Sequence, residues 1–236
     1  MKFKIIPVVV YVVFMMVLLA LGNWQLGRAE EKRHYFAMQA QASVAEMITL
    51  NDFMEEDMET LRYKKAQVMG HYDSRHQFLI DNQISGGKAG YFVMTPFLLK
   101  GKTSAVLVNR GWIPLMGNRA MLPSVDVGGE ETILTGRINA FPSVGVKLAG
   151  ADIPTEGWPS VVQVVDTQIL AKRLGYPLLA FQVELDKNLP GGFQRDWQTA
   201  SIMQPEQHIA YAIQWFALAL TLTILIFWYS FKKHND

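Results

Sequence analysis

Two long uncharged stretches near the ends of the chain constrain its fold most strongly. The first runs from Ile5 to Leu26 and the second from Ile209 to Phe231, and neither contains a charged residue. Each provides roughly the 20 apolar residues that a helix needs to cross the hydrocarbon core of a bilayer. The sequence therefore predicts two transmembrane helices, over residues 5–26 and 208–230, with a water-soluble domain between them.

The first stretch could also be a cleaved signal peptide, because Met1–Lys4 is short and basic. Its apolar run is too long for that, and Gly22–Gln25 is a poor small-residue cleavage site, so we interpret it as an uncleaved anchor. Lys232 and Lys233 follow the second stretch. The positive-inside rule then predicts cytoplasmic tails at residues 1–4 and 231–236, and a periplasmic central domain.

The composition excludes several classes of function. The 236 residues include no cysteine, so disulfides, thiolate zinc sites and cysteine copper carriers are ruled out. A net charge of +1 without a basic stripe argues against a nucleic-acid partner. The chain also lacks a Gly-x-Ser-x-Gly elbow, a His-Glu-x-x-His motif and a phosphate-binding glycine loop, which favours a non-enzymatic protein.

The central region has two textures. Residues 27–60 are rich in strong helix formers at their start, and we predict a juxtamembrane helical stalk there. Residues 61–200 alternate apolar and polar positions between glycine-rich turns, which predicts a β-rich domain. The expected strands are Arg62–Tyr72, Gln77–Asp81, Tyr91–Leu99, Ala105–Pro114, Thr132–Phe141, Val161–Val165 and Ala180–Leu185.

Most turns between these strands are short, which favours an antiparallel, barrel-like sheet. One helix is expected near residues 167–175, capped by Asp166 or Thr167 and closed by Gly175 and Pro177. The predicted fold class is thus a membrane protein in which two transmembrane helices flank an antiparallel β-rich, barrel-like α+β periplasmic domain.

His208 is the first candidate for a functional ligand, because an ionisable side chain at the entrance of a span is costly unless it is used. Tyr211 and Trp215 follow at i+3 and i+7 on the same stripe of the helix. Ala212 and Ala219 on that stripe would leave space for a flat ligand. The alternative is an interfacial histidine with two belt aromatics, and spacing alone favours this alternative.

A second candidate group lies at the outer end of the first span. Gln25, Arg28 and Lys32 share one helix face, and Trp24 lies one turn before Arg28. The two cations could receive a carboxylate group of a ligand. An aromatic belt with snorkelling cations explains the same residues.

Two further motifs belong to the predicted β domain. In the run Val108–Pro114, alternation puts Arg110 and Trp112 on one strand face, where the guanidinium could stack on the indole in a structural role. His71 and His76 flank a turn, but without a carboxylate or thiolate partner they make a weak metal site.

Taken together, four blocks resemble the surfeit locus protein 1 (Shy) family, bacterial type. The blocks are Gly22-x-Trp24-Gln25-x-x-Arg28-x-x-x-Lys32, Val108-Asn109-Arg110-Gly111-Trp112-Ile113-Pro114, Gly136-Arg137-Ile138 and His208-x-x-Tyr211-Ala212-x-Gln214-Trp215-Phe216. Their order, spacing and flanking spans all match, and the resemblance covers nearly the whole chain.

The resemblance implies a non-enzymatic assembly factor for a haem-copper terminal oxidase, cytochrome c oxidase, in a bacterial inner membrane. It implies that haem a is bound transiently and inserted into subunit I, with His208 as axial ligand of the haem iron. The other cofactor-binding residues expected by this resemblance are Tyr211, Trp215, Trp24, Gln25 and Arg28. Subunit I, haem A synthase, a second copy of the chain and membrane lipid are the expected partners.

An alternative remains open within the same resemblance. The chain could be a scaffold that binds no haem and stabilises an oxidase assembly intermediate through its periplasmic domain. Trp24, Arg28, His208 and Trp215 would then only hold the two spans together.

Overall fold

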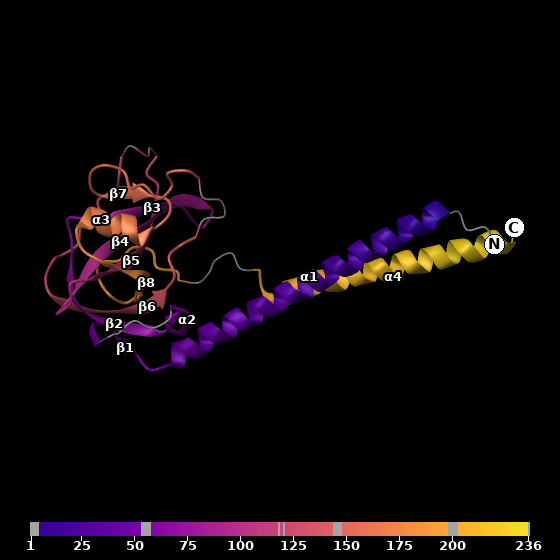
Figure 1. Ribbon diagram of the computed structural model, residues 1–236, viewed down its shortest axis with the longest axis horizontal. Coiled ribbons are helices and arrows are strands. Elements are labelled where there is room, and N and C mark those ends of the chain that lie inside the picture. The colour runs from indigo at the N-terminus through magenta and orange to yellow at the C-terminus, as the bar shows by residue number, and fades with distance from the viewer. Residues whose placement is uncertain are drawn as a thin grey trace. The chain divides into compact units, whose positions relative to one another are not determined.

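The computed structural model divides into two units, a helix pair and a β domain (Figure 1). The first comprises Met1–Met38 and Ser201–Asp236, and the second comprises Gln39–Ala200. Residues described by the structure are 5–52, 58–117, 119, 121–143, 148–197 and 203–235. The predicted tail 1–4 lies outside them. Two apolar helices at the ends of the chain flank a barrel-like sheet domain, which confirms this part of the predicted fold class, while the periplasmic placement stays a prediction.

The helix pair consists of α1 (Ile5–Val44) and α4 (Pro205–Asn235), and both are long and apolar enough to cross a membrane. They run antiparallel, since Tyr11 near the start of α1 bonds Thr223 near the end of α4, at 3.0 Å. The less exposed positions recur three and four residues apart, as in helices that pack like a coiled coil. They include Tyr11, Met15, Leu18, Gly22, Gln25 and Ala29 on α1, and His208, Ala212, Trp215, Ala219, Leu222 and Ile226 on α4.

The predicted stalk is only partly helical. Helix α1 continues to Val44, but β1 (Ile48–Thr49), a 3-10 turn (Leu50–Asp52) and α2 (Met58–Leu61) follow it, with residues 53–57 outside the description. The side chain of Asn51 explains the change, because it accepts from the backbone N–H of Met69 and donates to its carbonyl, both at 2.8 Å. These tertiary contacts override a helical preference that is only a weak prior.

The sheet of the β domain has eight strands in the order β1-β2-β6-β8-β5-β4-β3-β7, and an additional β2–β4 pairing curls it into a barrel-like form (Figure 1). The strands after β1 are β2 (Lys65–Tyr72), β3 (Phe78–Ser85), β4 (Lys88–Leu99), β5 (Ala105–Pro114), β6 (Thr132–Asn139), β7 (Ser160–Val162) and β8 (Leu178–Leu185). All seven predicted strands are present, and β1 is an addition. The pairs β1–β2, β3–β7 and β5–β8 are parallel, and the others are antiparallel.

The expected soluble helix is α3 (Thr167–Leu174). Asp166 caps its start, accepting from the backbone N–H groups of Gln168 and Ile169, and Gly175 ends it in a left-handed conformation with φ 82°. These are the cap residues that helix termini favour.

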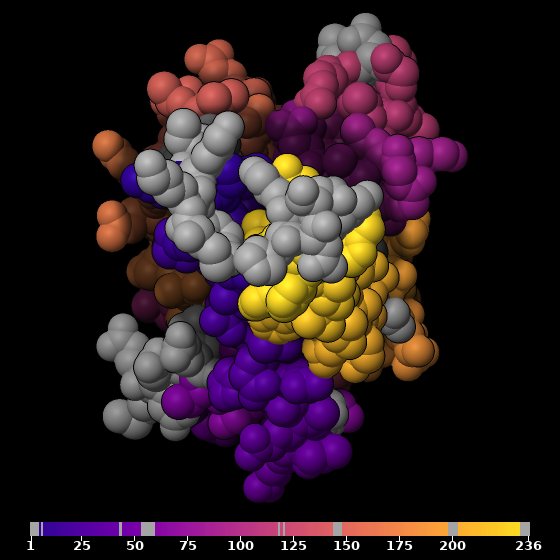
Figure 2. Space-filling model, turned by 90° about the vertical axis from the view of Figure 1, so that its right-hand side faces the viewer, coloured from indigo at the N-terminus to yellow at the C-terminus, as the bar shows by residue number. Residues whose placement is uncertain are grey.

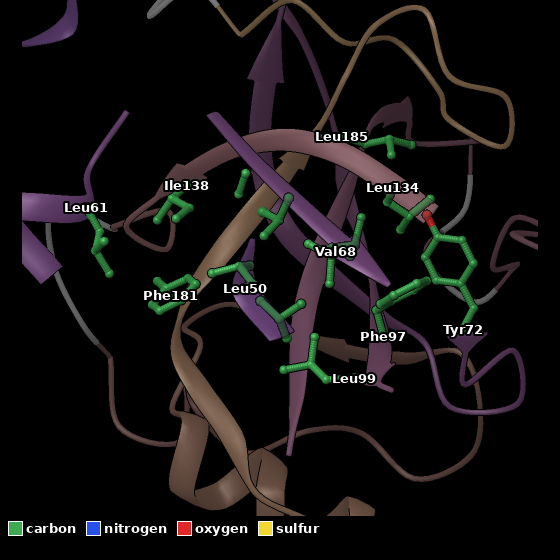
Figure 3. Close-up of a cluster of buried hydrophobic side chains, with 14 residues drawn as sticks. Leu50, Leu61, Val68, Tyr72, Phe97, Leu99, Leu134, Ile138, Phe181 and Leu185 are labelled. Atoms are coloured by element: carbon green, nitrogen blue, oxygen red, sulfur yellow. The ribbon is translucent and has the colours of Figure 1, made fainter. Parts of the chain in front are cut away.

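The largest hydrophobic core lies inside the barrel (Figure 3). Alternate residues of β2 point inward, so Ala66 and Val68 are buried while Lys65 is exposed. Leu50 from the segment after α1 and Leu61 from α2 join the same core. The last part of the predicted stalk, from Ile48 onward, therefore belongs to the β domain, because Leu50 is buried in its core.

A buried guanidinium at the centre of β5 connects several loops. Arg110 is 1% exposed and donates to Gln77 Oε1 at 2.9 Å and to the carbonyls of Val125 at 2.6 Å and Gly191 at 2.7 Å. It does not stack on Trp112 as predicted, because the rings that it covers are those of Tyr72 and Phe193, with 5.9 and 5.2 Å to their centroids.

The next two residues of β5 hold the segment that leads toward α4. The Trp112 backbone N–H donates to the carbonyl of Gln194 at 2.7 Å, and Gln194 donates back at 3.1 Å. Gly111 has φ 111°, and a Cβ there would lie 2.6 Å from the Gln194 carbonyl oxygen. Only glycine therefore permits this close approach. The Arg-Gly-Trp run therefore has a structural role, because it holds residues 193–194 against β5.

Replacing Arg110 by methionine is expected to lower the free energy of unfolding of the β domain by about 3–5 kcal/mol, because several oxygens lose their buried donor. Chemical unfolding of the full chain, followed by tryptophan fluorescence, measures this change. The exposed Arg75 provides the matched control, since Arg75→Met should leave the midpoint unchanged. Equal midpoints for the two variants would show that Arg110 does not carry the domain's stability.

Candidate functional site

His208 lies on the face of α4 that packs against α1 and is only 6% exposed. Its Nδ1 atom lies 2.7 Å from Oε1 of Gln25, 183 residues earlier in the chain. A carboxamide oxygen can only accept, so Nδ1 carries the proton and donates it to Gln25. Among the described residues, no hydrogen-bond partner is found for Nε2.

This hydrogen bond leaves the second ring nitrogen of the imidazole available. A histidine whose Nδ1–H is engaged keeps the lone pair on Nε2, and metal-ligating histidines are commonly held in this way by a second residue. The chemistry of His208 therefore fits an axial ligand of haem iron. No group of three His, Asp or Glu side chains able to hold a bare metal ion occurs within the described ranges, so a macrocycle would have to supply the other ligands.

Small residues bring the two helices together around this hydrogen bond. A Cβ at Gly22 would lie 2.5 Å from a ring carbon of Phe216, and Ala212 and Ala219 are almost fully buried. Small residues of this kind allow close approach of helices in membranes. The two alanines therefore serve helix packing and do not leave the open notch expected from the sequence.

The aromatic candidates divide into two groups. Trp24 and Tyr211 are 57% and 44% exposed, so they point away from the contact between the helices. Trp215 lies on the contact face, and its Nε1–H is buried without a hydrogen-bond partner in the part of the chain that the structure describes. An unpaired buried donor is costly, and an acceptor on a bound ligand would relieve that cost.

The cationic candidates are both partly buried on α1. Arg28 forms an ion pair with Glu31 at 2.5 Å, one turn further along the helix. Lys32 is partly buried, and no charged partner is described for it. The structure thus pairs Gln25 with His208 and leaves Arg28 with a neighbouring carboxylate, although the sequence placed Gln25, Arg28 and Lys32 together.

The β domain contains a polar cluster that the sequence did not reveal. Asp73 Oδ2 accepts from His76 Nδ1 and from the hydroxyl of Tyr176, both at 2.7 Å. His71 is exposed on β2 and stands apart from this cluster. The carboxylate partner of His76 was three residues away, a spacing that could have suggested it. The cluster joins the β2–β3 turn to the end of α3 and shows no ligand set for a metal.

Two opposing effects act on the Asp73 carboxyl. Burial disfavours its charge, but the hydrogen bonds from Tyr176 and His76 outweigh burial, so the pKa of Asp73 lies below its ordinary value of 3.8. Burial, followed by the bond to Asp73, raises the pKa of the Tyr176 hydroxyl, which keeps it a donor. A lowered folded-state pKa stabilises the fold above the ordinary pKa, and this contribution is lost as the pH falls through the folded value.

Asp73→Asn is therefore expected to destabilise the β domain at neutral pH, with a deficit that stays constant down to about pH 5 and shrinks below about pH 4. Unfolding midpoints of both proteins across this range test the expectation. Tyr176→Phe removes one donor and should give a smaller deficit with the same pH trend. A deficit that persists unchanged to about pH 3 would contradict the role of the ionised carboxylate.

Gln25→Leu is expected to release the His208 tautomer, because Nδ1–H loses its acceptor. Nitrogen NMR of the haem-free protein, labelled at histidine, should show a protonated Nδ1 in the wild type and a mixture with protonated Nε2 in the variant. Gln214 is exposed on α4, so Gln214→Leu is the matched control and should leave the spectrum unchanged. A mixed tautomer already present in the wild type would disprove the assignment.

Comparisons with known proteins cover most of the chain. A model of the SURF1 family matches residues 12–220. Surfeit locus protein 1 of Arabidopsis thaliana is 25% identical, covering 88% of this chain and 73% of its own length. A SURF1-like protein of Rickettsia bellii (strain RML369-C) is 26% identical, covering 95% and 89%.

A third relative is similar over a shorter stretch. Cytochrome oxidase assembly protein SHY1 of Saccharomyces cerevisiae is 32% identical over 94 residues, which cover 39% of this chain and 24% of that protein. The family match, in contrast, extends from α1 to α4 and includes Trp24, Gln25, Arg28, His208, Tyr211 and Trp215. The chain therefore belongs to the SURF1 family, as the resemblance of its motifs implied.

Proposed function

We propose that this protein is an assembly factor for cytochrome c oxidase that binds haem a transiently through His208 and assists its insertion into subunit I. Membership of the SURF1 family and the name of the yeast relative, a cytochrome oxidase assembly protein, support the role in assembly. Such a role requires no catalysis. The hydrogen bond from His208 to Gln25 is the observation that carries the haem proposal.

The other residues have separate roles in this proposal. Gln25 orients His208, and the exposed rings of Trp24 and Tyr211 offer apolar surface at the same level of the helix pair. The unpaired Nε1–H of Trp215 is available to an acceptor on the ligand. Arg28 could receive a haem carboxylate, provided that it gives up its ion pair with Glu31.

Nε2 is the atom of His208 that would bind iron. The helix pair covers most of the imidazole, since the residue is 6% exposed, and Gln25 keeps Nδ1–H engaged. Ligation at Nε2 would leave this bond in place. A single strong axial ligand suits temporary binding better than two histidines locked in place.

The proposed location is a bacterial inner membrane. Helices α1 and α4 would cross it, with both termini in the cytoplasm and the β domain in the periplasm. Subunit I of the oxidase is the proposed client, and haem A synthase is the proposed donor of haem. A second copy of the chain could share this role.

The haem proposal is tested by purifying the full chain from cells that make haem A. His208→Ala is expected to lose most of the Soret absorbance per protein, while His34→Ala, at an exposed histidine on α1, should retain it. Wild-type haem content in His208→Ala would remove this residue from the site.

The same preparations distinguish the alternative, a scaffold that binds no haem. Subunit I that co-purifies equally with the wild type and His208→Ala, when neither contains haem, would favour a scaffold acting through the β domain. Haem bound by the wild type and lost from the variant favours the haem-handling role.

A further inference from the structure

Four exposed apolar side chains lie on two neighbouring segments of the β domain, and we call this set the apolar tip. Ile84 belongs to the β3–β4 hairpin, and Met116, Met121 and Leu122 belong to the segment after β5. Their exposed fractions are 75%, 63%, 70% and 36%, respectively. Clustered exposed apolar groups usually mark a surface that contacts a partner or a membrane.

Polar contacts join the two segments that carry the apolar tip. Arg119 forms an ion pair with Asp81 and donates to Asn82 Oδ1 at 3.2 Å, which joins the loop to the hairpin. The Leu115 backbone N–H also donates to the carbonyl of Ala89 at 3.0 Å. These contacts hold the two segments side by side (Figure 2).

The charged residues beside the apolar tip indicate which kind of surface it could contact. Residues 82–90 and 115–124 contain Lys88 and Arg119 but no aspartate or glutamate. Arg119 is already paired with Asp81, so the exposed Lys88 leaves a net positive charge at the rim. Apolar side chains combined with basic ones, without acidic ones, fit the interface of an anionic bilayer.

The β domain is tethered at both ends to helices that are proposed to cross a membrane. The β domain continues at its beginning into α1 and at its end toward α4, the two helices proposed to cross the membrane. We propose that the apolar tip docks into the headgroup region of the same anionic membrane, which restricts the orientation of the β domain. This inference rests on the proposed membrane location and is independent of haem binding.

The absence of cysteine allows each position to be labelled alone. The full chain, placed in nanodiscs that contain anionic phospholipid, carries an environment-sensitive fluorophore at Ile84→Cys or Met121→Cys. Nitroxide-bearing lipids should quench these labels at least about twofold more than control labels, because docked side chains lie about 5–10 Å below the headgroup surface. Omitting the anionic lipid should reduce the quenching at both tip positions.

Matched controls come from the β domain itself. Leu148→Cys and Ile153→Cys are exposed to a similar degree, at 64% and 66%, and their labels should remain open to aqueous iodide. Leu220→Cys on α4 reports membrane insertion. Lipid quenching at Leu220 with none at Ile84 and Met121 would overturn docking of the tip while leaving the membrane location intact. Quenching of the tip labels by aqueous iodide would also overturn the proposal. This is the result expected if the tip binds a protein partner instead of a membrane.

Discussion

The β domain depends on one buried cation. Arg110 lies at the middle of β5, and its hydrogen bonds go to neutral oxygens on four other segments, residues 77, 95, 125–126 and 191. Burying a guanidinium is costly unless each of its donors is satisfied. Loops that curve around the barrel satisfy them here. One side chain thereby sets the course of segments that are far apart in the sequence.

The helix pair is held by different contacts, and between helices in a membrane lipid removes most of the hydrophobic driving force. Close approach at Gly22 and a polar bond between Gln25 and His208 remain as specific contacts. The same bond holds the imidazole with Nε2 free for a ligand. Helix pairing and the tautomer of His208 therefore depend on one interaction.

Much of the β domain could be predicted from local pattern. Strand β5 was expected at its observed bounds, and α3 was expected with its caps, because alternation and capping depend on neighbouring residues. The prediction of a helical stalk was wrong for the segment after Val44. Burial of Leu50 and the hydrogen bonds between Asn51 and Met69 override helix propensity there. The parallel pairs also escaped prediction, because no turn connects their strands directly.

The sequence by itself determined the two apolar helices and the alternating β pattern between them, and it singled out His208 as a candidate, because length, period and charge can be read along the chain. Only the tertiary structure decided which partner each polar group takes. Gln25 meets His208, Arg110 covers Tyr72 and Phe193, and the two alanines of α4 are buried in a helix contact. These choices depend on distant segments meeting in space, which no local pattern encodes.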